Sequence, residues 1–162
     1  MMANERVQIY LGISRCFLYP DEVLLRRLGE DYSLDELCIE YTRLFINGYP
    51  KMIAPPYGSV YIDGRLMGPS TMQVLAEYEK AGLGLNAQFK EPPDYICSEL
   101  EFMAYLWTQG KKQQEEEFRR SYFLSWAPTF FERVIKNTKL QFYKDITITA
   151  RDFFMEDIRG YK

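Results

Sequence analysis

Apolar residues recur at helical spacing along most of this 162-residue chain. Side chains three or four positions apart share one face of an α-helix, so such a stripe predicts a helix with one buried face. The segment 33–48 shows the pattern clearly, because Ser33 is a typical N-cap, Glu36 completes a capping box and Gly48 ends the stripe. The stripe itself consists of Leu34, Leu37, Cys38, Tyr41, Leu44 and Phe45. This periodicity predicts an all-α fold.

The same pattern continues between proline and glycine breaks. Ser70 and Asp94 each precede an apolar periodic run, so we expect them to be N-caps. The length suits one domain, and we find no internal repeat or linker, so we expect a single helical domain over residues 1–162. The further expected helices run from the N-terminus to Pro20, and over 21–28, 70–80, 94–109, 111–128, 130–135 and 140–158.

One long segment in mid-chain, residues 49–69, breaks the helical rhythm. Its prolines and glycines exclude a continuous helix, and Asp63-Gly64 between two short apolar runs predicts a small hairpin. The segment also carries Tyr49, Tyr57 and Tyr61, aromatic side chains that a merely solvated loop would not need. Long connections in compact domains are usually functional or mobile, so we expect an ordered loop with a binding role.

The sequence contains no histidine. Ser-His-Asp and Cys-His catalysis, the usual zinc sites and Glu-x-x-His di-iron bundles all require an imidazole. The run Glu115–Glu117 cannot gather around one ion, because adjacent helical residues point in different directions, and we expect it to form an exposed charged face. No glycine pattern matches a phosphate cradle. We therefore expect a chain without catalytic residues, metal or cofactor.

The charge balance and the cysteines restrict the partners and the compartment. With 20 Lys and Arg against 23 Asp and Glu, the chain lacks the basic excess that nucleic-acid binding requires. No apolar run approaches the roughly 20 residues needed to span a bilayer, and residues 1–15 lack a signal-peptide core. The three cysteines, Cys16, Cys38 and Cys97, are odd in number and widely spaced, which is typical of free thiols. We expect a cytoplasmic protein without nucleic-acid partners or stable membrane insertion.

Several motifs, in this order, give the chain a family resemblance. The segment 91–96 reads Glu-Pro-Pro-Asp-Tyr-Ile, and residues 100–103 read Leu-Glu-Phe-Met. Upstream stand Glu40 to Phe45, Pro56 to Tyr61 and Gly68-Pro69-Ser70-Thr71, and downstream stands Leu124 to Phe130 with its Trp-Ala-Pro-Thr-Phe core. Together they resemble the TorD/DmsD/NarJ family of redox enzyme maturation chaperones over residues of about 40 to 131.

The resemblance implies an all-helical, cytoplasmic chaperone. Such chaperones bind the N-terminal signal or leader peptide, often a twin-arginine one, of a molybdenum or tungsten bis(pterin) oxidoreductase subunit. They hold that subunit back from export or assembly until its cofactor is inserted. The family motif has a histidine where this chain has Tyr95, so a role of that histidine in pH-sensitive release or nucleotide binding is not carried over.

A leader peptide with basic residues and an apolar stretch needs an apolar groove with an acidic rim. We expect Tyr57 and Tyr61 to form a wall of that groove, and Asp94 to pair with a leader arginine beside Tyr95. We expect Glu91 and Glu99 to form the acidic rim. The remaining expected peptide-binding residues shape the backbone: Pro56, Gly68 and Pro92.

Two other functions stay open from the sequence. One is a helical adaptor that binds an amphipathic helix of an unrelated partner, and the other is an enzyme that uses Tyr or carboxylate chemistry. The sequence does not identify the client oxidoreductase or any nucleotide or cofactor-precursor ligand. It also leaves open a monomer or a domain-swapped dimer, since a long mid-chain loop permits swapping.

Overall fold

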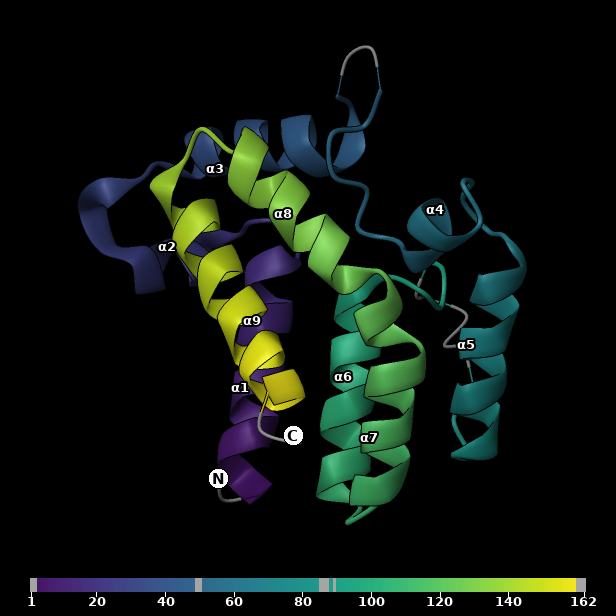
Figure 1. Ribbon diagram of the computed structural model, residues 1–162. Coiled ribbons are helices and arrows are strands. Elements are labelled where there is room, and N and C mark those ends of the chain that lie inside the picture. Colours follow the sequence, from purple (N-terminus) through teal and green to yellow (C-terminus); the bar gives the residue numbers. More distant parts are fainter. Residues whose placement is uncertain (1–2, 49–50, 85–87, 89, 160–162) are drawn as a thin grey trace. The chain divides into compact units, whose positions relative to one another are not determined.

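The computed structural model describes residues 3–48, 51–84, 88 and 90–159, with side chains described from 4 to 156 within these ranges. The chain forms two compact units, Met1–Ser14 with Pro56–Ala127 and Arg15–Pro55 with Pro128–Lys162. All regular elements within the described ranges are helical (Figure 1). The predicted all-α class is thereby confirmed, whereas the single domain stays a prediction.

The first unit is built from one half of the N-terminal helix and from the middle of the chain. The helix α1 (Ala3–Phe17) contributes its residues up to Ser14. The helices α6 and α7 lie side by side, joined by a short turn at Gly110 (Figure 1). The elements that follow α1 in this unit are α4 (Gly58–Ile62), α5 (Pro69–Lys80), α6 (Ile96–Thr108), α7 (Lys112–Ser121) and the 3-10 turn η3 (Phe123–Ser125).

The core of the first unit is formed by the predicted inward face of α6. Ile96, Leu100, Met103 and Leu106 are all buried, as the helical spacing predicts. Glu99, which that spacing places off the stripe, is buried as well. Aromatic rings complete the core, with Tyr78, Phe102, Phe118, Phe123 and Trp126 buried.

The second unit surrounds an aromatic core. Phe17, Phe45, Phe130 and Phe131 contact one another with ring centroids 5.3–6.4 Å apart. The elements of this unit are the end of α1, then α2 (Glu22–Leu28), the 3-10 turn η1 (Gly29–Asp31), α3 (Leu34–Tyr41), the π-turn η2 (Thr42–Ile46), most of α8 (Ala127–Asn137) and α9 (Gln141–Arg159).

Side-chain caps set two helix starts in the second unit, of which only the Ser33 cap was predicted. Asp21 accepts hydrogen bonds from the backbone of Val23 and Leu24, which starts α2. Ser33 and Glu36 form the predicted capping box of α3. The helix α9 forms although its run Ile146–Thr149 is β-branched, because tertiary packing of its apolar face outweighs the weak local propensity.

The mid-chain segment differs from the prediction. The predicted hairpin at Asp63-Gly64 is wrong, because residues before it form the short helix α4 and Asp63 ends that helix. The expected cap Ser70 is also wrong: α5 begins at Pro69, and the Asp63 carboxylate accepts hydrogen bonds from the backbone N–H and the hydroxyl of Ser70. Tyr49 and Pro50, which we included in the loop, lie outside the described residues.

No helix in the described part of the chain combines the length and the apolar character that crossing a bilayer requires.

Candidate functional site

The two segments that carry the strongest motifs are joined by backbone hydrogen bonds. Tyr57 and Tyr95 form an isolated antiparallel bridge. The N–H of Gly58 donates to the Asp94 carbonyl at 2.9 Å, and the N–H of Ile96 donates to the Pro56 carbonyl at 2.9 Å. Residues 56–58 and 94–96, which are separated by nearly 40 positions, therefore form one structural junction at the start of α4 and α6.

Asp94 holds this junction together from inside. It is only 1% exposed, and its Oδ2 accepts a hydrogen bond from the N–H of Ser59 at 2.7 Å. The expected role of Asp94 as the N-cap of α6 is wrong, because Tyr95 occupies the cap position without a side-chain cap bond. The carboxylate instead binds the first turn of α4, where free N–H groups need an acceptor. Asp94 is thus buried below the surface, and its pairing with a leader arginine stays a prediction.

The two tyrosines of the predicted wall, Tyr57 and Tyr61, have separate environments. The Tyr57 hydroxyl donates to Glu91 at 2.7 Å, and its ring lies 5.6 Å from the buried Tyr95 ring. Tyr61 stacks on Trp126, with centroids 5.6 Å apart and an interplanar angle of 28°. Tyr57 and Tyr61 are half-buried. Both therefore present only part of their rings to a ligand.

The three expected backbone-shaping residues, Pro56, Gly68 and Pro92, lie in or near the turns around the junction. Pro56 is buried, and the Pro92 carbonyl accepts a hydrogen bond from the N–H of Tyr95 at 3.0 Å. Gly68 packs directly against the Asp63 side chain, so an added Cβ would collide with the carboxylate that binds Ser70. Both prolines and this glycine thus fix the turns around the junction.

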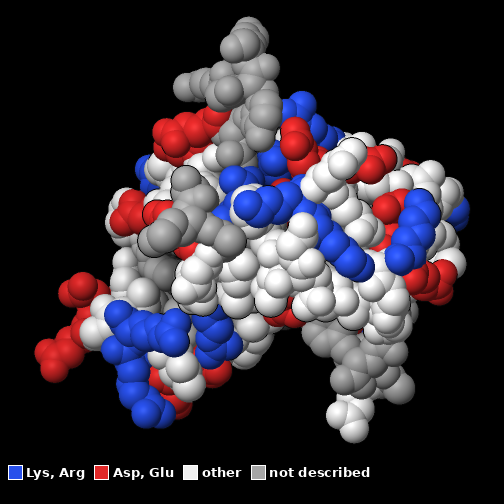
Figure 2. Space-filling model, turned by 90° about the horizontal axis from the view of Figure 1, so that it is seen from below, with Lys and Arg blue, Asp and Glu red and all other residues white. Residues whose placement is uncertain are grey.

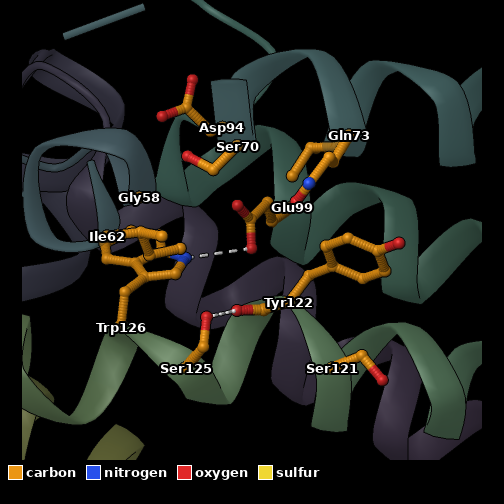
Figure 3. Close-up of a pocket in the computed structure, with 11 residues that line it drawn as sticks. Gly58, Ile62, Ser70, Gln73, Asp94, Glu99, Ser121, Tyr122, Ser125 and Trp126 are labelled. Carbon is orange, nitrogen blue, oxygen red and sulfur yellow. Dashed lines mark hydrogen bonds between the residues drawn. The ribbon is translucent and has the colours of Figure 1, made fainter. Parts of the chain in front are cut away.

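A cavity of about 160 Å³ opens beside this junction. Figure 3 shows its lining, which includes Asp94, Glu99 and Trp126, with the Glu99 carboxylate directed toward the Trp126 indole. The buried Gly58, Ser70 and Val74 also line it, while the exposed lining residues mark where the cavity reaches solvent. These exposed residues are Ile62, Gln73, Ser121 and Ser125.

Glu99 lies in the floor of the cavity and not at a rim. Its side chain is 1% exposed, and its Oε2 accepts a hydrogen bond from the Trp126 indole N–H at 3.3 Å (Figure 3). Burial raises the pKa of Glu99 well above its usual value, the Asp94 charge raises it further, and the bond from Trp126 opposes both. The cavity is therefore lined by two acidic residues whose charges interact.

The sequence reasoning missed several residues that build this cavity. Trp126 and Gly58 both lie within motifs that carry the family resemblance, but neither was predicted to bind the peptide. An added Cβ on Gly58 would lie 2.9 Å from the Trp126 Nε1, so this glycine lets the indole pack against α4. The sequence signal that could have indicated this contact is Gly58 itself, directly after Tyr57. A glycine in a motif often marks a place where another group packs closely against the backbone.

The described residues show neither a metal cluster nor a reactive thiol. Within them, no group of three or more His, Cys, Asp or Glu side chains is arranged to hold a metal ion.

Burial raises the pKa of the Cys97 thiol to about 12, so it is a protonated core residue. Glu115 is not exposed as predicted: it is buried and ion-paired with Arg119 at 2.9 Å.

Charges on the surface are mixed. On the face shown in Figure 2, Lys and Arg side chains are interspersed with Asp and Glu. This pattern agrees with the small net charge of −3 and with the expectation that nucleic acid is not a partner, which stays a prediction.

Comparisons with known proteins agree on one family. The profile of the family described as "Nitrate reductase delta subunit" matches residues 20–132. The chaperone protein TorD of Shewanella loihica is 30% identical over 128 residues, which cover 75% of this chain and 60% of that protein. TorD of Aliivibrio fischeri is 31% identical over 143 residues, covering 80% and 66% of the two chains.

Two further relatives extend the comparison. The Tat proofreading chaperone DmsD of Salmonella typhi is 29% identical over 122 residues, covering 74% of this chain and 59% of that protein. The crystal structure of an Archaeoglobus fulgidus protein described as a redox enzyme maturation protein has a TM-score of 0.67 and 30% identity, with 93% of each chain covered.

The matched region thus spans about 60% of the length of the Shewanella loihica relative and nearly all of the Archaeoglobus structure. The named relatives are chaperones and not enzymes. The chain belongs to the nitrate reductase delta subunit family, the family of TorD, DmsD and NarJ chaperones for redox enzyme maturation.

Proposed function

We propose that this protein is a cytoplasmic, system-specific chaperone that binds the N-terminal signal or leader peptide of a molybdenum or tungsten bis(pterin) oxidoreductase subunit. It assists cofactor insertion and maturation of that subunit before export or assembly, and it needs no cofactor of its own. Family membership supports the chaperone role, since the relatives include TorD proteins and a Tat proofreading chaperone.

The observation that carries the peptide-binding proposal is an acidic cavity beside an exposed apolar surface. Asp94 and Glu99 make the cavity acidic, and its lining includes no Lys or Arg. The turn between α4 and α5 adjoins the cavity through Ile62, which lines its mouth. The end of α4, this turn and the first part of α5 expose four large apolar side chains, which we call the apolar lip: Ile62, Leu66, Met67 and Met72.

This combination matches the chemistry of a leader peptide. A leader contributes basic residues followed by an apolar stretch, so the cavity accepts the first and the apolar lip accepts the second. Methionine side chains are flexible and polarisable, and they suit a surface that must bind peptide side chains of differing shape. Tyr57 and Tyr61 contribute the exposed parts of their rings to the same region.

The first test uses the full chain as bait in the native host, followed by mass spectrometry. We expect the catalytic subunit of a bis(pterin) oxidoreductase as the main bound protein, and we expect its loss when the leader of that subunit is deleted. A synthetic peptide of that leader must then bind the purified chain in a calorimeter. Capture that persists without the leader would contradict the proposal and favour an adaptor for another partner helix.

A further inference from the structure

Asp94 and Glu99, which line the cavity beside α4, each have one carboxylate oxygen that no described residue binds. Glu99 Oε2 has the Trp126 indole, but Glu99 Oε1 is buried and accepts no hydrogen bond from any described residue. Asp94 Oδ2 has the Ser59 N–H, while Asp94 Oδ1 is buried and equally without a partner among the residues described. An unsatisfied buried carboxylate oxygen costs free energy, so native proteins rarely keep one without a reason.

Other buried carboxylates of this chain show that the fold satisfies such groups elsewhere. Glu115 is as buried as Glu99, yet its Oε1 accepts hydrogen bonds from Arg119 at 2.9 Å and from the Tyr10 hydroxyl at 2.6 Å. The Glu99 cavity lacks such a cation in its own lining. A cation with several N–H donors that entered the cavity would supply the partners that these oxygens lack.

The titratable groups that face Glu99 supply no positive charge to its carboxylate. Asp94 faces it from the segment before α6, and Tyr78 from α5 has its own pKa raised by burial and then by the charges of Glu99 and Asp94. Tyr122, which follows α7, donates its hydroxyl to Glu77 at 3.2 Å, and the exposed Lys80 is ion-paired with that same Glu77. The short helix α4 contributes only Gly58 and Ile62 to the lining.

We propose that this cavity is a subsite for one guanidinium group of the bound peptide, and that Glu99 releases a proton to solvent when the guanidinium enters. The inference rests on the proposed function and specifies its recognition step. A planar guanidinium has five N–H donors, enough to serve Glu99 Oε1 and Asp94 Oδ1 together. Glu99 is the specificity-determining residue, since one oxygen of Asp94 already accepts a hydrogen bond from the Ser59 N–H in α4.

Proton release follows from the environment of the empty cavity. Burial and the Asp94 charge both favour the neutral, protonated form of Glu99. An entering cation favours the charged carboxylate and displaces that proton. Binding of the cation must therefore strengthen as the pH rises, until Glu99 is ionised without it.

The test uses N-ethylguanidinium chloride as a probe that needs no knowledge of the client. The chain has two tryptophans, so the ¹⁵N-labelled indole N–H of Trp126 reports the cavity and that of Trp107 serves as an internal control. Trp107 stacks against Arg6 and Lys112 and does not line the cavity. A Trp107→Phe variant assigns the two signals.

We expect N-ethylguanidinium to shift the Trp126 signal saturably, with an affinity at pH 8 at least threefold higher than at pH 6. N-ethylurea, which is neutral and of the same shape, must not shift it, and ethylammonium must bind more weakly. Glu99→Gln must reduce the affinity at least tenfold. The matched control is Glu101→Gln, because Glu101 is exposed on the same helix and its bond from Ser14 is retained by the amide oxygen.

Equal shifts of both indoles, an effect of N-ethylurea, or an affinity that does not change with pH would overturn the inference. If the Glu99→Gln variant does not fold, the comparison of pH values and the comparison with N-ethylurea, both made on the wild-type chain, still test the inference. Leader binding without a saturable Trp126 shift by the probe refutes the subsite and leaves the chaperone function standing. A saturable shift by the probe without leader binding supports the subsite and refutes the proposed function.

Discussion

Glu40 in the second unit and Glu99 in the first are both buried glutamates, but their surroundings differ completely. Glu40 is 4% exposed and receives two hydrogen bonds of 2.7 Å from the Arg43 guanidinium. Its Oε1 also accepts from the Thr138 hydroxyl at 3.2 Å and from the Lys139 N–H at 2.6 Å. Glu99 has a single long bond from Trp126 and an acidic neighbour.

The pKa values of the two glutamates shift in opposite directions, which distinguishes a residue that stabilises the fold from one that is available to a ligand. Burial raises the pKa of Glu40, but the bonds from Arg43 and Lys139 outweigh it, so the net direction is downward. The pKa of Glu99 moves upward, because burial and Asp94 outweigh the Trp126 bond. A buried carboxylate that the fold has fully partnered stabilises the fold, whereas one left with a free oxygen in a cavity is available to a ligand.

The largest expected effect is on stability. Glu40→Gln removes the charge that binds Arg43, so we expect the free energy of unfolding to fall by about 2–3 kcal/mol. The matching Glu99→Gln substitution leaves the stability unchanged or raises it at pH 7, because the amide carries no charge for burial and Asp94 to disfavour. Urea denaturation of the two variants measures both values, and a large loss for Glu99→Gln would remove the distinction.

The pH dependence of the same two variants must have opposite signs. The folded pKa of Glu99 is raised, so its contribution to stability is complete below about 4.5 and is lost as the pH rises toward the folded value. The folded pKa of Glu40 is lowered, so its contribution is present above about 4.5 and is lost as the pH falls.

Urea denaturation between pH 3 and 8 tests this opposition. The stability of wild type relative to Glu99→Gln must decline with rising pH, by at most about 1.4 kcal/mol per pH unit. The stability of wild type relative to Glu40→Gln must decline toward acid pH instead. Parallel curves for the two pairs would show that both glutamates have the same role.

The third prediction concerns affinity. Asp94→Asn keeps an oxygen that can accept from the Ser59 N–H but removes the charge, so we expect a folded variant with leader affinity about tenfold lower, or about 1.4 kcal/mol. Calorimetry with the leader peptide measures this loss, and circular dichroism checks the fold. Asp63→Asn is the control, since Asp63 binds Ser70 and does not line the cavity. Equal losses in both variants would assign the effect to the fold.

The smallest effect concerns the apolar lip. Met67 has φ = 58°, a left-handed conformation that favours glycine, so we expect Met67→Gly to raise the free energy of unfolding by about 0.5–1 kcal/mol. The same change removes an exposed apolar side chain and must weaken leader binding about twofold to threefold, a loss near 0.5 kcal/mol.

Leu66→Gly is the matched control for this position. Leu66 is equally part of the apolar lip but is not among the residues with positive φ, so its replacement must weaken binding without raising the stability. A Met67→Gly variant that binds the leader as tightly as wild type would exclude this turn from the peptide-binding surface.

The fold class was accessible from sequence because capping residues and apolar stripes agreed along most of the chain. Ser33 with Glu36 and the buried face of α6 are examples in which local chemistry and packing coincide. The region around α4 was not accessible, because its geometry depends on partners distant in sequence. Asp94 is a good local N-cap by residue type, but its carboxylate binds Ser59, 35 positions away.

The candidate site was predicted only in part for the same reason. The sequence singled out both segments of the junction, and the structure joins them at Tyr57 and Tyr95. Helical spacing placed Glu99 outside the core, because periodicity assigns charged residues to the exposed face unless a buried role is known. The position of Trp126 over Glu99 depends on the turn η3, which no sequence pattern indicated.

The most direct test of the account is a double-mutant cycle between Glu99 and a leader arginine. Calorimetry gives the affinity of wild type and Glu99→Gln for the leader peptide and for peptides in which one arginine at a time is replaced by citrulline, its neutral isostere. We predict that for one arginine the two changes are strongly coupled: each alone weakens binding at least tenfold, and both together weaken it little further. Losses that simply add for every arginine would contradict the claim that Glu99 binds the leader.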